Sequence, residues 1–360
     1  MITYLLRKLI ALAVVLVVAS FLVYGLLYLV PGGPMAFLLG NRSGTPEQIA
    51  AIRAQYRLDD PFLVRYAAWL GDAVRGDFGS SLVYRQHVSG LMAARAATTA
   101  FLVGYSTVLI VVVGVAGGVL AGLRRGRVDA VISAVSSAFL ATPTFVIGVL
   151  LVIVFALGLG WFPVFGPGEG LFGRLYHLTL PAITLSLGSA AFLARITRAS
   201  VREELGREHV ETARSRGIAE ALVIRRHVLR NASIPVITVT GLTVAGLIAG
   251  SVVVENVFAL DGLGSLFVRA ILQRDFAVVQ AVVLVLVAAF VLINLVVDLC
   301  TKPSTRGCPD DRRGHPRARD TRPVQPVPCG ACPRYTWRRR GGTDRRGADG
   351  HAAGTRPCSL

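Results

Sequence analysis

Charge and lysine are scarce in this 360-residue chain, and several familiar catalytic patterns are missing from it. Charged residues make up 16% of the sequence, and the only lysines are Lys8 and Lys302. No G-x-x-x-x-G-K-[ST] pattern occurs, so the chain carries no phosphate-binding loop of its own. Neither H-E-x-x-H nor G-x-S-x-G is present, which leaves a membrane protease or lipase without support. The low charge also argues against an ordinary soluble domain.

Cysteine is absent from the first 299 residues, and all five cysteines lie in a tail of different composition. Cys329-Gly-Ala-Cys332 has no convincing second ligand pair, so we expect neither a metal site nor a redox pair there. Residues 301–360 hold 14 of the 38 basic and 5 of the 21 acidic residues, a net charge of +9. This composition predicts a disordered basic tail over residues 300–360. Its arginines could touch anionic lipid, but nucleic acid is not among the partners we expect.

The hydrophobic residues, 53% of the chain, are concentrated in six long runs. The first run has 22 residues and no charge, and a helix of that length extends about 33 Å, enough to cross a bilayer core. The six runs are Leu9–Val30, Phe101–Leu123, Ile132–Leu159, Leu178–Ala194, Val236–Val254 and Ala277–Val297. We therefore predict an all-α membrane protein with six transmembrane helices.

Arginine is distributed unevenly among the segments that connect these runs. Arg7 and Lys8 precede the first run, three arginines follow the second, and nine lie between positions 195 and 230. The loops after the third and fifth runs hold one and two arginines. Because basic loops stay in the cytoplasm, we expect both termini and the Arg-rich loop to be cytoplasmic. The first run is too long for a signal peptide and has no A-x-A site, so we expect an uncleaved first span (1–30 with its N-terminus).

Residues 31–98 form the one sizeable segment that we expect on the external side. Thr45 and Pro46 predict the start of a helix. Phe62–Val74 predicts a short amphipathic helix, and Gly76-Asp-Phe-Gly79 predicts its end. We expect this segment to cap the external mouth.

Small and polar residues inside the spans predict packing sites and a few weak pathway candidates. Glycines four apart, at 114, 118 and 122 in the second span and at 246 and 250 in the fifth, predict close helix packing. Pro143 predicts a kink in the third span. The polar candidates for a solute pathway are Ser136, Thr144, Thr240 and Thr243, and those for an external gate or receptor contact are Glu255 and Asn256.

The Arg-rich loop contains HVETARSRGIAEALVIRRHVLRNASIP at residues 209–235. After Gly217, the apolar residues form one helical stripe, and they are Ile218, Ala221, Leu222, Val228 and Leu229. We predict a short helix, a turn and a second helix at the cytoplasmic surface, with Pro235 at the entry to the fifth span. Physical chemistry alone favours a helix resting on anionic lipid. A secondary transporter or channel with a lipid-binding loop is therefore the alternative function.

The spacing within this loop resembles that of a known family. Glu211-Thr-Ala213, then Gly217, then Pro235 eighteen residues later resembles the EAA loop of binding-protein-dependent ABC importer permeases. The ending His227-Val-Leu-Arg-Asn-Ala-Ser-Ile-Pro235 resembles their dipeptide, oligopeptide and nickel branch. The resemblance covers nearly the whole body, through Val30-Pro-Gly-Gly-Pro34, Gly76-Asp-Phe-Gly-Ser-Ser81, Thr142-Pro-Thr-Phe145, Val254-Glu-Asn-Val-Phe258 and Arg274-Asp-Phe-Ala-Val-Val-Gln280. The sequence departs from the motif in having Thr212 in place of the middle alanine.

The resemblance implies a type-1 ABC importer permease fold, with a five-helix core over residues 99–299 and a cytoplasmic coupling loop over 201–235. In such permeases this loop docks in a cleft of a cytoplasmic ATPase subunit. The coupling residues that it implies are Glu211, Thr212, Ala213, Arg214, Gly217, Glu220, His227 and Pro235. Gly217 would let the helix seat closely, whereas Arg214, Arg216, Glu220 and His227 would form the rim of the contact.

The resemblance further implies a transport subunit without a cofactor or enzymatic activity, in a bacterial plasma (inner) membrane. The implied partners are a second homologous permease, two cytoplasmic ATPase subunits and an external solute-binding protein, in addition to membrane lipid. The six helices would form half of a pathway for dipeptides, oligopeptides, glutathione-like molecules or nickel chelates.

The end of the chain departs from this family. Its members usually finish with a leucine, a tyrosine and Asp-Pro-Arg. Codons for Cys300–Arg306 can be chosen so that a reading two bases later gives Tyr-Glu-Ala-Leu-Asp-Pro-Arg. We therefore interpret the tail as a frame-shift product rather than a functional segment, and resequencing the gene around codon 300 tests this.

Overall fold

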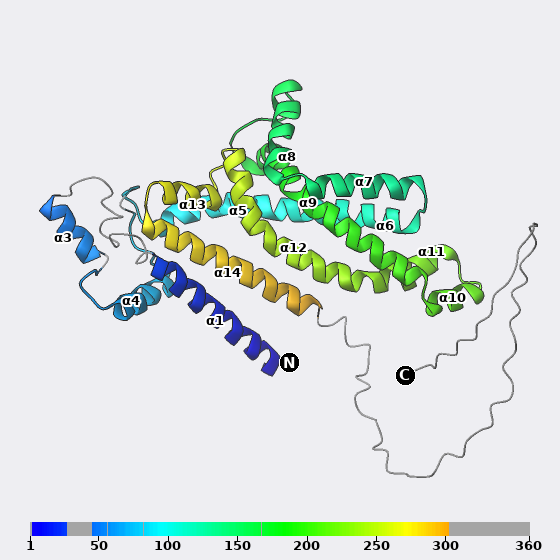
Figure 1. The fold of residues 1–360 in the computed structure, drawn as a ribbon, viewed down its shortest axis with the longest axis horizontal. Helices are drawn as coiled ribbons and strands as arrows, with labels where there is room; N and C mark the ends of the chain where they lie inside the picture. Colours follow the sequence, from blue (N-terminus) through cyan, green and yellow to red (C-terminus); the bar gives the residue numbers. More distant parts are fainter. Residues whose placement is uncertain (1, 27–44, 56, 82, 167, 302–360) are drawn as a thin grey trace, which may run out of the picture. The chain divides into compact units, whose positions relative to one another are not determined.

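The computed structural model describes residues 2–26, 45–55, 57–81, 83–166 and 168–301, whose regular structure is helical (Figure 1). One isolated antiparallel bridge joins Ser80 and His87. The predicted tail lies outside the described residues except for Cys300 and Thr301, which end the last helix. Residues 27–44, part of the predicted external segment and of the first apolar run, also lie outside them.

The chain forms α-helices with three π-helical segments among them. In chain order the elements are α1 (Ile2–Leu26), α3 (Pro46–Gln55), α4 (Phe62–Val74), α5 (Val88–Leu109), η1 (Ile110–Val115), α6 (Ala116–Leu123), α7 (Arg127–Ala141), α8 (Thr144–Leu151), η2 (Val152–Gly158), α9 (Gly170–Leu205), α10 (Glu208–Ser215), α11 (Glu220–Val223), η3 (Ile224–Val228), α12 (Leu229–Val257), α13 (Leu263–Leu272) and α14 (Phe276–Thr301).

Five helices among the described residues are long and apolar enough to cross a membrane, and a broken pair makes a sixth span. The five are α1, Val88–Leu123, α9, Glu220–Val257 and α14. The pair is α7 and α8–η2, which bend by 104° at Thr142 and Pro143. Proline disfavours helical backbone at the preceding residue, and Thr142 is extended at ψ 126°. All six predicted spans therefore have a helical counterpart, but the third is broken rather than kinked.

The second span begins 13 residues before its apolar run, inside the segment predicted to be external. Val88, Leu91 and Met92 follow the i, i+3, i+4 pattern of one helix face. They are buried in a cluster with residues of α13 and α14, including Leu266. Arg95 interrupts the apolar run on this first part of α5. The helix therefore starts at Val88, well before Phe101, where the predicted apolar run begins.

Helix α9 is the centre of the bundle and packs against α5, η1, α6, α7, α8 and α12. Glycine allows the closest of these contacts. A Cβ atom at Gly118 would lie 2.4 Å from Cβ of Thr197 and 2.5 Å from the carbonyl oxygen of Ala194. Such distances are shorter than van der Waals contact, so a side chain at Gly118 would separate the two helices. The predicted glycine packing of the second span is confirmed.

The glycine prediction for the fifth span was correct for one of its two residues. A Cβ atom at Gly250 would lie 2.9 Å from Cδ1 of Leu185. Gly246, in contrast, has open space, with no described atom within 4 Å of such a Cβ. The closest approach in α12 is at Gly241, where Val297 of α14 fills the space that a side chain would need. Sequence spacing did not single out Gly241, because its contact comes from a helix far along the chain.

Helix α4 spans Phe62–Val74, as predicted, and rests on α1. Phe21 and Tyr24 of α1 form ring contacts with Phe62 and Tyr66 of α4. The hydroxyl groups of Ser20 and Tyr66 form a buried hydrogen bond of 2.8 Å. α3 begins at Pro46, also as predicted. The contacts of Phe62 and Tyr66 thus hold α4 on α1, the first span.

Candidate functional site

The Arg-rich loop folds as the predicted helix, turn and helix. α10 covers Glu208–Ser215, and the second helix begins at Glu220. Between them Gly217 has φ of +72°, a left-handed conformation that glycine adopts without steric cost. The Gly217 N–H donates to the carbonyl oxygen of Arg214 at 2.9 Å, and no described atom would come within 4 Å of a Cβ there. Within this chain the turn, rather than close packing, therefore requires the glycine.

One face of α10 fastens the loop to the bundle. Val210 and Ala213 are buried together with Val201 of α9 and with Val223 and Val228 of the second helix. Glu211 and Thr212, which precede Ala213 in the motif, are exposed. The motif alanine thus serves the fold, and its two neighbours remain available to a partner.

The predicted apolar stripe of the second helix was correct for three of its five residues, since Val228 is buried and Ile218 and Leu229 pack against the same cluster. Val223 is fully buried, whereas Leu222 is 48% exposed and Ala221 is exposed as well. The helix starts at Glu220 rather than at Ile218 and then widens into the π-helical segment η3. A wheel drawn at 3.6 residues per turn from Ile218 therefore placed Ala221 and Leu222 on the buried face in place of Val223.

Arg214 and Glu220 join the two helices across the turn. The Arg214 guanidinium donates from Nη2 to Glu220 Oε1 at 2.6 Å and from Nε to Oε2 at 3.1 Å. This two-point hydrogen bond raises the pKa of Arg214. Both residues were predicted as rim contacts, but in this structure they bind each other and brace the turn.

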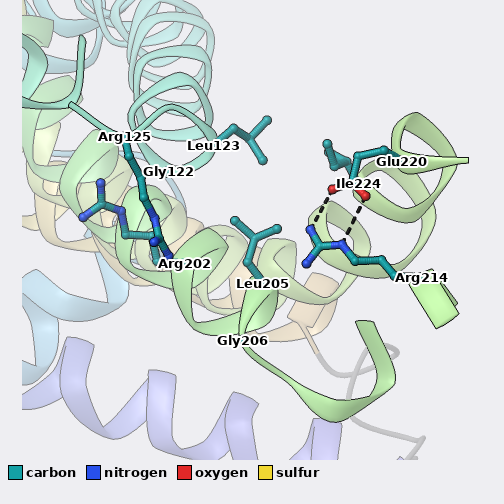
Figure 2. A pocket seen from close by; sticks show the side chains of 9 residues that line it. All are labelled: Gly122, Leu123, Arg125, Arg202, Leu205, Gly206, Arg214, Glu220 and Ile224. Atoms are coloured by element: carbon teal, nitrogen blue, oxygen red, sulfur yellow. Dashed lines mark hydrogen bonds and ion pairs between the residues drawn. The ribbon is translucent and has the colours of Figure 1, made fainter. Parts of the chain in front are cut away.

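The pair borders a cavity of about 640 Å³ between the loop and the C-terminal ends of α6 and α9. In Figure 2, Arg125 and Arg202 lie on one side of this cavity, and Arg214 with Glu220 lies on the other. Leu123 and Leu205 are placed between them. The ion pair thus braces the turn, while Leu123 of α6 and Ile218 of the turn pack against the buried cluster that contains Ala213 and Val223.

The predicted His227 and Pro235 lie on the second helix. His227 is in η3, and its ring centre lies 6.5 Å from that of His209 on α10. Pro235 does not interrupt the helix, which runs without a break from Glu220 to Val257. The loop and the fifth span are therefore one continuous element.

Asp129 is a residue of this region that sequence reasoning missed. It lies in the first turn of α7 and accepts hydrogen bonds from Arg198 and Arg202 of α9, the latter at 2.6 Å. The signal was present, since Asp129 is the single acid in a short basic stretch that starts at Arg124. The pairing fixes the first turn of α7, where the third span begins, to α9.

Four of the predicted pathway residues lie in different surroundings. Thr240 and Thr243 donate to the carbonyl oxygens of Val236 and Val239 in their own helix, at 2.7 and 2.8 Å. Ser136 is buried beside a cavity between α7 and α9, and Thr144 is exposed at the start of α8. The structure does not bring the four together, and their contact with solute stays a prediction.

The predicted gate residues Glu255 and Asn256 differ in exposure. Glu255 is fully buried, and its carboxylate accepts hydrogen bonds from Thr99 Oγ1 at 2.7 Å and from the Ser265 N–H at 2.9 Å. Asn256 is exposed and donates to the carbonyl oxygen of Val252 at 2.7 Å. In this conformation only Asn256 is open to a partner, and the gate role of either residue stays a prediction.

A polytopic helical bundle with a helix–turn–helix loop joined to one span defines the class of an integral membrane transport component. Comparison with protein families identifies it further. The family described as binding-protein-dependent transport system inner membrane component matches residues 114–302, and its N-terminal family matches residues 1–102. The chain belongs to this family.

Curated relatives agree with this assignment. The glutathione transport system permease protein GsiC of Escherichia coli K12 is 37% identical over 300 residues, which covers 83% of this chain and 96% of the relative. The probable peptide ABC transporter permease protein y4tP of Sinorhizobium fredii NGR234 is also 37% identical over 300 residues, with 82% and 96% coverage. A crystal structure of an amino acid ABC transporter with histidines contains a chain that is 17% identical, with a TM-score of 0.49, covering 60% of this chain and 94% of that one.

The chain is therefore a multi-pass permease subunit of an ABC importer. It is a transport subunit that works with ATPase and solute-binding protein partners. This family assignment replaces the alternative of a secondary transporter or channel.

Proposed function

We propose that this permease forms half of a translocation pathway for peptides or a related solute, and that ATPase subunits drive it through the loop at residues 209–235. The solute class is supported by relatives named for glutathione and for peptide transport. Dipeptides, oligopeptides, glutathione-like molecules and nickel chelates are the members of this class that we propose.

The exposed face of the loop carries the proposal for coupling. Glu211, Thr212 and Gly217 are exposed, while Ala213 between them is buried and fixes their position. The second helix continues without a break into the fifth span. A partner that pushes on the turn at Gly217 would therefore move a membrane helix directly.

The proposed assembly contains this chain, a second homologous permease, two cytoplasmic ATPase subunits and an external solute-binding protein. We place it in the bacterial inner membrane with both termini and the loop in the cytoplasm, because the arginines gather at those segments. Anionic lipid would contact the remaining exposed arginines of the loop, such as Arg225 and Arg226.

Two loop variants test the coupling proposal. Gly217→Arg places a bulky side chain at a left-handed turn, and Glu211→Lys reverses an exposed charge on α10. Glu169→Lys is the matched control, because it reverses an exposed charge at the opposite end of the bundle, before α9. We expect both loop variants to insert normally but to lose ATPase co-purification and solute uptake, while the control keeps both.

Uptake at the wild-type rate in both loop variants would refute docking at this site. The solute class is tested separately by measuring binding of glutathione, alanine peptides and nickel chelates to the cognate solute-binding protein. Exclusive binding of an unrelated sugar would refute the proposed solute while leaving the coupling proposal intact.

A further inference from the structure

A small polar cavity of about 130 Å³ lies between α7 and α9, next to the Asp129 ion pairs. α7 contributes Ser133, Ser136 and Ser137 to its wall, and α9 contributes Arg195 and Arg198. Its volume equals that of about four water molecules in the liquid. The cavity therefore has room for one small polar group rather than a whole peptide.

Positive charge around this cavity exceeds negative charge. Asp129 is the carboxylate that joins α7 to α9, and its two oxygens are taken by Arg198 and Arg202. Arg195 is exposed and forms no ion pair with any described residue. Three guanidinium groups thus share one carboxylate, and the guanidinium of Arg195 is left for an anion from outside the chain.

Two hydroxyl groups in the wall are also without partners among the described residues. Thr142, directly after α7, instead donates to the carbonyl oxygen of Ala138 at 2.8 Å. Ser136 and Ser137 form no such bond, although Ser136 is only 8% exposed. A hydroxyl donor that faces a cavity without a partner is able to bind a ligand oxygen.

The position of Arg195 makes an anionic partner energetically important. It directly follows the apolar run Leu178–Ala194, at the edge of the predicted fourth span. An arginine at such a depth is costly unless it meets an anion, water or lipid headgroup. The guanidinium of Arg195 on α9 and the two hydroxyls on α7 line the same cavity, and together they suit the planar, two-oxygen shape of a carboxylate.

We propose that this cavity is an oxyanion subsite that receives a carboxylate of the transported solute, bound by Arg195 and by the hydroxyl groups of Ser136 and Ser137. The inference rests on the proposed function, because peptides and glutathione carry such a carboxylate. The subsite lies near the cytoplasmic end of α9, so it acts on solute that is leaving the pathway. A phosphate of a lipid headgroup is the other source of the same oxyanion chemistry.

The experiment compares acid and amide forms of one solute. The complete complex, with its ATPases and solute-binding protein, is reconstituted in proteoliposomes, and uptake of trialanine and of trialanine amide is measured. If the receptor prefers glutathione, the pair is glutathione and glutathione with both carboxyl groups amidated. The variants are Arg195→Gln, Arg195→Lys and a Ser136→Ala/Ser137→Ala double change. Arg174→Gln is the matched control, an exposed arginine on α9 far from the cavity.

We expect Arg195→Gln to slow uptake of the acid form about tenfold while changing uptake of the amide form less than about twofold, since one charge-assisted hydrogen bond is lost. Arg195→Lys should retain part of the preference for the acid, and the serine variant should lose part of it. Every measurement uses the same solute-binding protein, so its own selectivity cancels when the uptake rate of each permease variant is divided by that of the wild type.

Equal slowing of both forms, or no slowing of either, would overturn the proposal. Slowing that disappears when anionic phospholipids are replaced by neutral ones would assign Arg195 to lipid phosphate and also overturn it. Receptor-stimulated ATP hydrolysis is measured in the same vesicles. Because coupling through Gly217 is read from that hydrolysis, failure of the subsite is distinguishable from failure of the proposed function.

Discussion

Thr99 in α5 donates a hydrogen bond from Oγ1 to Oε1 of Glu255 in α12 at 2.7 Å, across 156 positions of the chain. The Ser265 N–H at the start of α13 binds the other carboxylate oxygen at 2.9 Å. A Cβ atom at Gly262 would lie 2.3 Å from the carboxylate carbon, and one at Gly264 would lie 2.9 Å from Oε2. Two glycines thus make room for one buried carboxylate that joins three helices.

Removal of this carboxylate should destabilise the permease. We expect Glu255→Ala to lower the free energy of unfolding by about 1–3 kcal/mol, because it leaves the Thr99 hydroxyl and the Ser265 N–H buried without an acceptor. Thr99→Val should cost less, since one partner remains. Thermal unfolding of the purified complex measures both, with Asn256→Ala as the neighbouring exposed control. Equal midpoints for Glu255→Ala and the control would contradict the assignment.

Gly118→Ala should disrupt the contact of the second span with α9. The added methyl group would come within 2.4 Å of Thr197 and force α6 away from α9, at a cost of about 1–3 kcal/mol. Gly104→Ala, in the same span, has no described atom within 4 Å of its Cβ and should be neutral or slightly stabilising. Thermal unfolding midpoints of the two variants give the comparison. Equal midpoints would contradict the prediction that close packing of Gly118 on α9 stabilises the permease.

The ion pair across the Gly217 turn predicts a charge-exchange result. Arg214 and Glu220 are 41% and 54% exposed, so Arg214→Glu should reduce stability by less than about 1 kcal/mol. It should nevertheless lower solute uptake, because like charges would push α10 and the second helix apart. The double variant Arg214→Glu/Glu220→Arg should restore uptake. If the double variant is as impaired as the single one, the pair contacts a partner rather than bracing the turn.

Asp275 predicts a pH effect on stability. It is 1% exposed, and burial raises the pKa of its carboxyl above the usual value, although hydrogen bonds from Ser81 and the Val278 N–H favour the charged form. A folded-state pKa above the unfolded value means that stabilisation is fully present below the unfolded pKa and is lost as pH rises through the folded pKa.

Asp275→Asn removes this titration, so the wild type should lose stability relative to the variant as pH rises from about 4 to about 7. Thermal midpoints of both proteins across that range provide the measurement. Asp77→Asn changes an exposed carboxyl near the same external turn and should show no such trend. A wild type that gains stability relative to Asp275→Asn as pH rises would reverse the assigned sign.

Local patterns predicted much of the fold, because a bilayer leaves few choices for long apolar runs. The helix at Phe62–Val74 and the turn at Gly217 follow from spacing and from glycine chemistry. The break at Pro143 was underestimated as a kink, because its 104° angle depends on where α8 packs against α9 and α12. The early start of α5 at Val88 depends on distant partners in α13 and α14 that no local window contains.

The candidate site was predictable as a segment but not as a set of contacts. Family spacing placed Glu211, Ala213 and Gly217 in one loop, yet it could not show that Ala213 faces inward while Glu211 faces outward. The π-helical segment Ile224–Val228 has no sequence rule, and Val223 just before it is buried in place of the predicted Leu222. Asp129 and Arg198 are 69 positions apart, so only the fold brings them together.

Because the helix from Glu220 to Val257 is unbroken, a movement at its loop end is transmitted to its far end. Its 38 residues extend about 57 Å, so a swing of about 5° around one end displaces the other by about 5 Å. Glu255 lies two residues from the far end. Its close contacts with Thr99, Gly262 and Gly264 leave no room for such a displacement unless α5 and α13 move with it. Inner and outer faces of the permease would consequently change shape in a single stroke, rather than one after the other.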